Sequence, residues 1–196
     1  VNEVEYQRGG GTLTASADLL LLSAGVYHSP QILMLSGIGP KDQLEQFGIP
    51  VVNDLPGVGQ NLMNHLSAQV TFKVKDGLSL HGDFDAVHFG LHYTSDGSTE
   101  MNDMLLRTTP MVDERPERVP GLRTKFLNDD IPSDRVARLS VTLGLPDGSG
   151  YVRLASSDPS EQPTFNYCYL QDPNDRRRVR EGIRKAAEFL ESNAYK

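Results

Sequence analysis

The residues best suited to cofactor chemistry stand where a leucine-rich run ends. Ser23-Ala24-Gly25 closes the run and precedes a predicted helix. Because none of the three carries a bulky side chain, another group can approach the backbone closely at this point. The start of the helix adds free N–H groups and a partial positive charge, which favour a phosphate. The pattern suits a phosphate-bearing cofactor at the carboxyl edge of a sheet, although small residues serve tight packing of a helix on a strand equally well.

Histidine and cysteine offer two further candidates. His88 and His92 stand four apart on a predicted helix and could share a metal ion, but no third ligand stands nearby, so ordinary surface imidazoles are the alternative. Cys168 lies between two tyrosines, which favours a small buried hydrophobic residue over a nucleophile. The sequence has no P-loop, nucleophile elbow or H-E-x-x-H pair, and Gly57-Val58-Gly59 lacks the third glycine of a dinucleotide fingerprint. We therefore assign no catalytic and no metal-binding residue.

Composition excludes several classes of protein. The 196 residues carry 26 acidic side chains against 19 Lys and Arg, and the formal charge of −7 argues against a nucleic-acid partner, which requires a basic face. One cysteine excludes a disulfide framework and a four-thiolate zinc site. The longest apolar run, Leu19–Leu22, is far shorter than the about 20 residues of a membrane span. No export signal is recognised, so we expect a soluble, cytoplasmic protein.

Short segments organise the chain around the small-residue turn. Glu3–Gln7 and Thr12–Ser16 alternate on either side of a glycine turn, which predicts a hairpin. Asp18–Ala24 is a continuous apolar run, typical of a strand buried on both faces of a parallel sheet. Ser29 provides an N-cap hydroxyl and Pro30 a first-turn proline, so we expect a helix over 30–35. The same rules predict a second helix, an extended stretch and a turn, at 41–47, 49–52 and 55–59.

Beyond a boundary that we place near Leu66, alternating runs are separated by acidic, proline-bearing connections. Four strands and one helix are predicted, at Ala68–Val74, Met104–Thr108, Arg138–Leu145 and Tyr151–Ala155, and at Asp85–Tyr93. The clearest helix has Asp172 as its N-cap and Pro173 in its first turn. Its apolar residues recur as one buried stripe: Val179, Ile183, Ala186, Ala187 and Leu190. We therefore expect a solvated face for its basic cluster, which consists of Arg176, Arg177, Arg178 and Arg180.

Three longer segments carry recognisable patterns. Leu20–Pro40 reads LLLSAGVYHSPQILMLSGIGP, and Asp54–Leu66 reads DLPGVGQNLMNHL. Gly150–Tyr169 reads GYVRLASSDPSEQPTFNYCY and is followed by the helix that begins at Asp172. The first segment resembles the second signature of the glucose–methanol–choline (GMC) oxidoreductases, flavoenzymes that act mainly on alcohols. The second is similar to that family's D-L-P-G-V-G-x-N-L-x-D-H element, with Asn64 in place of the usual aspartate, and the third resembles its substrate-domain strands.

The resemblance implies a fold and a cofactor. The fold is α/β (mixed α+β), with part of an FAD-binding Rossmann-like domain over 1–66 and part of an antiparallel-sheet substrate domain over 67–196. The implied cofactor is FAD. The positions that match the family's cofactor region and its N-L-x-D-H element are Ala24, Gly25, Ser29, Asn61 and His65. Gly148-Ser149-Gly150 lacks the arginine often found before the next strand of the family.

The resemblance also implies an activity. A small-molecule alcohol, choline-like, sugar, aryl or alkyl, is oxidised by hydride transfer to flavin while a histidine acts as base. None of the five histidines matches that base and the family's glycine-rich fingerprint is missing, so we interpret the chain as a central fragment that needs the remainder of the same enzyme. Asp18–Ala24 would then lack parallel neighbours and leave an apolar face uncovered. Two alternatives stay open: a hydroxynitrile-lyase-like enzyme on the same scaffold, and a non-catalytic α/β binding module.

Overall fold

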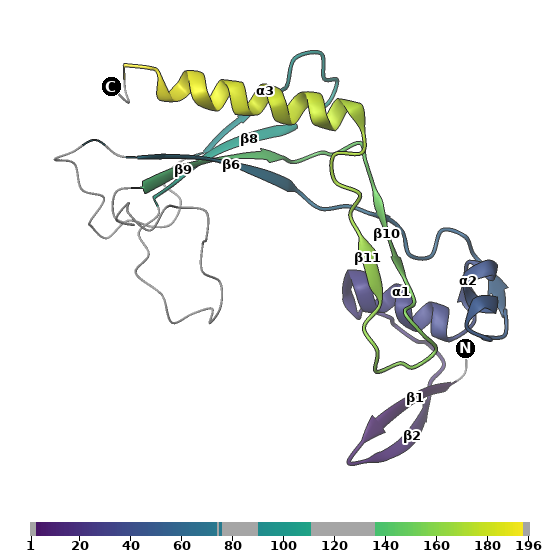
Figure 1. Ribbon diagram of the computed structural model, residues 1–196. Coiled ribbons are helices and arrows are strands. Elements are labelled where there is room, and N and C mark those ends of the chain that lie inside the picture. Colours follow the sequence, from purple (N-terminus) through teal and green to yellow (C-terminus); the bar gives the residue numbers. More distant parts are fainter. Residues whose placement is uncertain (1–2, 74, 76–89, 111–135, 194–196) are drawn as a thin grey trace. The chain divides into compact units, whose positions relative to one another are not determined.

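A computed structural model describes residues 3–73, 75, 90–110 and 136–193, without the side chains of 109, 110 and 136 (Figure 1). The chain divides into two compact units. The first consists of Val1–Leu62 and Tyr151–Asn166, and the second of Met63–Gly150 and Tyr167–Lys196. Helices and several separate sheets occur together, so the predicted mixed α/β fold is confirmed.

The first unit begins with the predicted hairpin. β1 (Glu3–Arg8) pairs antiparallel with β2 (Gly11–Ser16), with Tyr6 opposite Leu13. Alternation places Val4, Tyr6, Leu13 and Ala15 on one face of the hairpin and only polar side chains on the other. All the residues of both strands are exposed, so no described element covers the apolar face.

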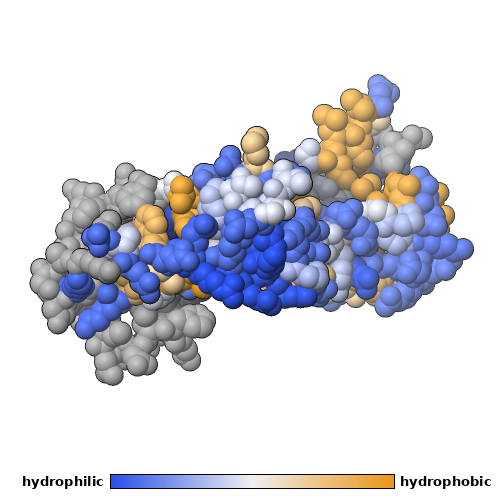
Figure 2. Space-filling view, turned by 90° about the horizontal axis from the view of Figure 1, so that it is seen from above, coloured by the Kyte–Doolittle hydropathy of each residue, from blue (hydrophilic) through white to orange (hydrophobic). Residues whose placement is uncertain are grey.

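The leucine-rich run does not form a strand. No sheet in the described part of the chain includes Asp18–Ala24, and Leu19 and Leu21 are 74% and 80% exposed. The prediction of a buried strand is therefore wrong for this segment, because a strand in a parallel sheet requires hydrogen-bonded neighbours and none of the described strands supplies them. The exposure agrees with the expectation that an apolar face is left uncovered, and Figure 2 shows apolar surface on the first unit, at the right of the view.

Two helices and a short parallel pair follow. α1 (Gly25–Leu35) begins at Gly25, not at the predicted Pro30, and α2 (Lys41–Gln46) lies where a helix is predicted. β3 (Ile38–Gly39) pairs in parallel with β4 (Asn53–Asp54). A small core joins α1, α2 and the returning segment through Met34, Leu44 and Leu154.

The return of the chain at Tyr151–Asn166 completes this unit. β5 (Gln60–Leu62), β10 (Gly150–Arg153) and β11 (Thr164–Asn166) form a sheet in the order β11-β10-β5. β10 confirms the strand predicted at Tyr151–Ala155. The Val152 N–H donates to the Gly59 carbonyl at 2.6 Å, and Gly59 has a φ of +78°. A Cβ at Gly59 would collide with the Val152 carbonyl, which explains the second glycine of the Gly57-Val58-Gly59 turn.

The second unit is built on an antiparallel sheet in the order β6-β9-β8-β7. Its strands are β6 (Leu66–Lys73), β9 (Val136–Leu143), β8 (Met104–Pro110) and β7 (Gly90–Tyr93). Three of the predicted strands are confirmed with small shifts at their ends. The predicted helix over Asp85–Tyr93 is wrong for its last part, because Gly90–Tyr93 pairs with β8 as β7; its first part, 85–89, lies outside the described residues.

α3 (Pro173–Leu190) packs on one face of this sheet (Figure 1). Asp172 caps it as predicted, since its carboxylate accepts the N–H groups of Asn174 and Asp175. The buried side of α3 is rotated from the predicted stripe: Val179, Gly182 and Ala186 are buried, whereas Ile183 is 40% exposed and Ala187 is also exposed. The outer face of α3 is hydrophilic (Figure 2). Neither α3 nor any other helix in the described ranges has the length and apolarity of a membrane span.

Candidate functional site

The N-terminus of α1 is open. Ala24 is its N-cap, no side chain caps the helix in the usual way, and the first turn holds no acidic residue. Gly25 has a φ of +85°, which a residue with a Cβ rarely adopts, and no atom lies within 4 Å of the position that a Cβ would take. The first turn therefore offers its N–H groups with no carboxylate in the turn to compete for them, and the space beside Gly25 is open.

Ser29 lies beside this turn, but not as the predicted N-cap. Its Oγ accepts a hydrogen bond from the Ala24 N–H at 3.0 Å and so ties the helix to the residue before it. Pro30 lies inside α1 and removes one internal helix hydrogen bond. The predicted helix start is wrong because the Ser-Pro pair marks a start by local rules, whereas the chain already turns into a helix at Gly25.

Residues far along the chain fix α1 in place. The buried Gln31 side chain donates through Nε2 to the Glu161 carbonyl at 2.7 Å, and its Oε1 lies 2.8 Å from His28 Nδ1. The rings of Tyr27 and Phe165 lie 4.7 Å apart between centroids. Glu161 and Phe165 both belong to the returning segment, and no local sequence signal indicates these contacts.

Three of the five predicted cofactor residues lie together. Ala24, Gly25 and Ser29 meet at the start of α1. Asn61 belongs to β5 of the same unit, with a φ of +60°. His65 belongs to the second unit and is exposed, and its backbone N–H donates to the Asn64 side chain at 2.9 Å.

The histidine pair and the cysteine that the sequence offers form neither a metal site nor a nucleophile site within the part of the chain that the structure describes. His92 lies on β7 and not on a helix, and His88 is outside the described residues, so the helical spacing proposed for a metal pair does not hold. Cys168 is half-buried and forms no disulfide, and its φ is +52°.

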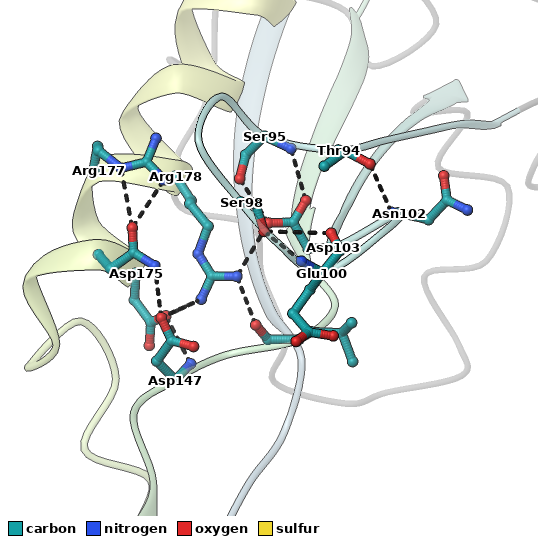
Figure 3. A network of polar contacts seen from close by, with 12 residues as sticks. Thr94, Ser95, Ser98, Glu100, Asn102, Asp103, Asp147, Asp175, Arg177 and Arg178 are labelled. Carbon is teal, nitrogen blue, oxygen red and sulfur yellow. Dashed lines mark hydrogen bonds and ion pairs between the residues drawn. The ribbon is translucent and has the colours of Figure 1, made fainter.

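Arg178 is the largest departure from the sequence-based expectation. Its side chain is only 1% exposed, so the prediction of a solvated face is wrong for this member of the basic cluster (Figure 3). Its guanidinium donates to Asp103 at 3.1 Å, to Asp175 at 2.6 Å and to the Leu145 carbonyl at 2.8 Å. A buried cation requires such partners, and Asp103 and Leu145 come from segments that are distant in sequence.

The carboxylates around Arg178 are structural partners. Burial alone would raise the pKa of Asp103, but hydrogen bonds from Ser95 and Arg178 outweigh it and hold the pKa below its ordinary value. Burial likewise opposes the charge of Arg178, yet Asp103 and Asp175 keep its pKa above the ordinary value. Asp147, Asp172 and Asp175 place carboxylate oxygens within 4.8 Å of one another. Arg178 already pairs with Asp147 and Asp175, and Asp172 caps α3, so this group is explained without a metal ion.

Comparison with known proteins identifies relatives over most of the chain. Two family models, both described as GMC oxidoreductase, match residues 1–67 and 146–196. The chain is 32% identical to a glucose methanol choline oxidoreductase, atC, of Aspergillus terreus, over 100% of this chain and 36% of that protein. It is 32% identical to an oxygen-dependent choline dehydrogenase of Photobacterium profundum, over 95% of this chain and 35% of that protein.

A solved structure has a similar fold. A formate oxidase variant of Aspergillus oryzae RIB40, studied for FAD modification, matches with a TM-score of 0.79 and 23% identity, over 99% of this chain and 41% of that one. The chain thus spans about a third of the length of the relatives that it matches in sequence.

Proposed function

Because the chain belongs to the GMC oxidoreductase family, we propose that it forms part of an FAD-dependent enzyme that oxidises an alcohol. The observation that carries the proposal is the open, glycine-led N-terminus of α1. Oxidoreductase relatives over nearly the whole chain support the reaction class. The alcohol itself, choline-like, sugar, aryl or alkyl, stays a proposal.

The start of α1 fits the phosphate groups of FAD. Its first turn offers N–H donors and the positive end of the helix dipole, and no acidic side chain in that turn repels an anion. Ala24, Gly25 and Ser29 would hold the cofactor there, and Asn61 and His65 remain weaker candidates. When bound, FAD supplies an acceptor for the hydride of the alcohol.

The other residues of the first unit keep this helix end in position. Gln31 and Tyr27 anchor α1 to the returning segment, so the N–H groups hold a fixed direction before a ligand arrives. Such preorganisation lowers the free energy needed to order the site on binding. We assign 1–66 to the flavin-binding part and 67–196 to the substrate-binding part, with Tyr151–Asn166 folding onto the former.

The exposed leucines indicate that this site needs further polypeptide. Leu19 and Leu21 lie just before Ala24 and are mostly solvent-exposed. Burial of these side chains by neighbouring strands would fix the turn, since each contributes about 1.5–3 kcal/mol when fully buried. We expect the isolated 196-residue chain to bind FAD weakly or not at all and to show no turnover.

The test is a pair of glycine substitutions in the natural polypeptide that carries this chain. Gly25→Ala should lower flavin occupancy, because it disturbs the helix start and fills the space before it. Gly48→Ala is the matched control: Gly48 has a φ of +67°, also has no atom near its Cβ position, and lies in the same unit. Both changes cost about 1–2 kcal/mol of backbone strain, so a difference in flavin content reports the site and not stability.

Flavin absorbance measured on the purified proteins gives the occupancy. Equal flavin content in the two variants would reject the assignment of the site. Bleaching of the bound flavin by an alcohol without oxygen separates an alcohol oxidoreductase from a lyase, which need not reduce its flavin. Absence of flavin from the natural polypeptide would favour the non-catalytic module.

A further inference from the structure

The second unit has a polar sheet face opposite α3. Along β6, the side chains alternate between half-buried apolar residues and exposed polar ones. The apolar set packs toward α3 together with buried residues of β8 and β9. The opposite face carries polar side chains from all four strands: Ser67, Gln69, Thr71, Lys73, His92, Arg107, Arg138, Ser140 and Thr142.

Because of the strand register, side chains that can donate hydrogen bonds lie next to one another at the centre of this face. Gln69 and Arg107 lie on either side of Ser140, in one row across β6, β9 and β8. Arg138 lies two residues from Ser140 on β9 and is therefore the diagonal neighbour of Arg107 across the two strands. The Cα atoms of such a diagonal pair lie about 7–8 Å apart. The Ser140 hydroxyl donates to Gln69 Oε1 at 2.8 Å, so the amide NH₂ of Gln69 remains able to donate elsewhere.

Two guanidinium groups on this face, those of Arg107 and Arg138, have no partner among the residues that the structure describes. No hydrogen bond or ion pair holds Arg107 or Arg138 within the described ranges, and Arg107 Nε is buried without an acceptor. No aspartate or glutamate stands on this face in the described strands. The buried Nε of Arg107 needs an acceptor, since a buried unsatisfied donor is costly. An anion would supply that acceptor and would also balance the charge of the neighbouring Arg138.

We propose that this face binds the oxyanion of a small organic molecule, a carboxylate for which Arg107 and Arg138 supply charge and Gln69 an amide donor. Guanidinium groups bind carboxylates through paired N–H donors, which gives direction as well as charge. The oxyanion site stands on the second unit alone. Only its identification with the alcohol substrate, which would then be a hydroxylated acid, rests on the proposed function.

A matched pair of ligands tests the site. Calorimetry on the purified natural polypeptide compares para-(hydroxymethyl)benzoate with para-(hydroxymethyl)benzamide, which have nearly the same shape and differ in charge. The benzoate should bind at least about tenfold more tightly, which corresponds to about 1.4 kcal/mol, and its affinity should fall with added salt. Equal affinities would overturn the proposal.

Variants then assign the residues. Arg107→Gln or Arg138→Gln should remove most of the preference for the benzoate, and Arg107→Lys should restore part of it. Arg180→Gln is the control, since it removes an exposed arginine from α3, which packs on the other face. Retention of the full preference in both single variants and in the double variant would also overturn the site. If the carboxylate preference is found but none of the choline-like, sugar, aryl and alkyl alcohols bleaches the flavin, the site stands and the proposed function is rejected. If an alcohol bleaches the flavin but the carboxylate preference is absent, the proposed function stands and the site is rejected.

Discussion

Replacement of Arg178 by methionine should destabilise the second unit by about 3–5 kcal/mol, because it leaves buried carboxylates without their cation. Asp103 is fully buried and Asp175 nearly so, and water cannot replace the lost partner at either carboxylate without opening the unit. The Leu145 carbonyl loses a donor at 2.8 Å as well. Asp147 is 48% exposed, so its pair at 3.1 Å adds little.

Urea unfolding followed by circular dichroism measures this loss. With a slope of about 2 kcal/mol per M, the midpoint should fall by about 2 M. Hydrogen exchange in α3 should quicken, whereas exchange in α1 should be unchanged because α1 belongs to the other unit. Arg177→Met is the neighbouring control: Arg177 makes an exposed i,i+4 pair with Glu181 at 3.3 Å, which is worth well under about 1 kcal/mol. If the two variants unfold at the same urea concentration, Arg178 does not hold the unit together.

Three more changes have defined outcomes. Gly182→Ala should destabilise the second unit by about 1–3 kcal/mol, because the added methyl group overpacks against Val141. This cost exceeds the about 1 kcal/mol by which alanine stabilises a helix relative to glycine. A higher unfolding temperature for the variant would contradict the packing. Asp103→Asn should cost most stability near neutral pH. The folded-state pKa of Asp103 lies below its ordinary value of 3.8, so ionised Asp103 stabilises the unit above that pH, and the difference from the variant should vanish in urea titrations as the pH falls through the folded pKa. Gln31→Leu should leave the Glu161 carbonyl without its donor, cost about 1–3 kcal/mol and speed hydrogen exchange in Tyr151–Asn166; unchanged exchange there would show that the bond does not anchor the segment.

Local patterns predict the elements whose partners stand nearby in sequence. The hairpin needs only its own glycine turn, and α3 shows its start through Asp172 and Pro173. The prediction for the leucine run fails for the opposite reason, since a parallel strand exists only when other strands pair with it. A short apolar segment such as Gly90–Tyr93 fits the period of a helix or of a strand, and only its pairing with β8 decides between them.

In the candidate site, too, local sequence predicts some features, whereas others depend on residues that are distant in sequence. Small residue types indicate the open turn at Ala24 and Gly25, whereas the role of Ser29 depends on the actual start of the helix. Arg178 cannot be told from the solvated Arg177 by any local pattern, because its buried partner Asp103 lies 75 positions away. Likewise, the row that joins Gln69, Ser140 and Arg107 exists only once three strands have aligned.

The bond between Gln31 and Glu161 spans 130 positions, and most of the second unit lies between its two ends in the sequence. During synthesis on the ribosome, the helix that carries Gln31 must wait for that stretch to emerge before its anchor exists. Leu19 and Leu21, just before this helix, are exposed throughout that wait, as they also are in the folded 196-residue chain.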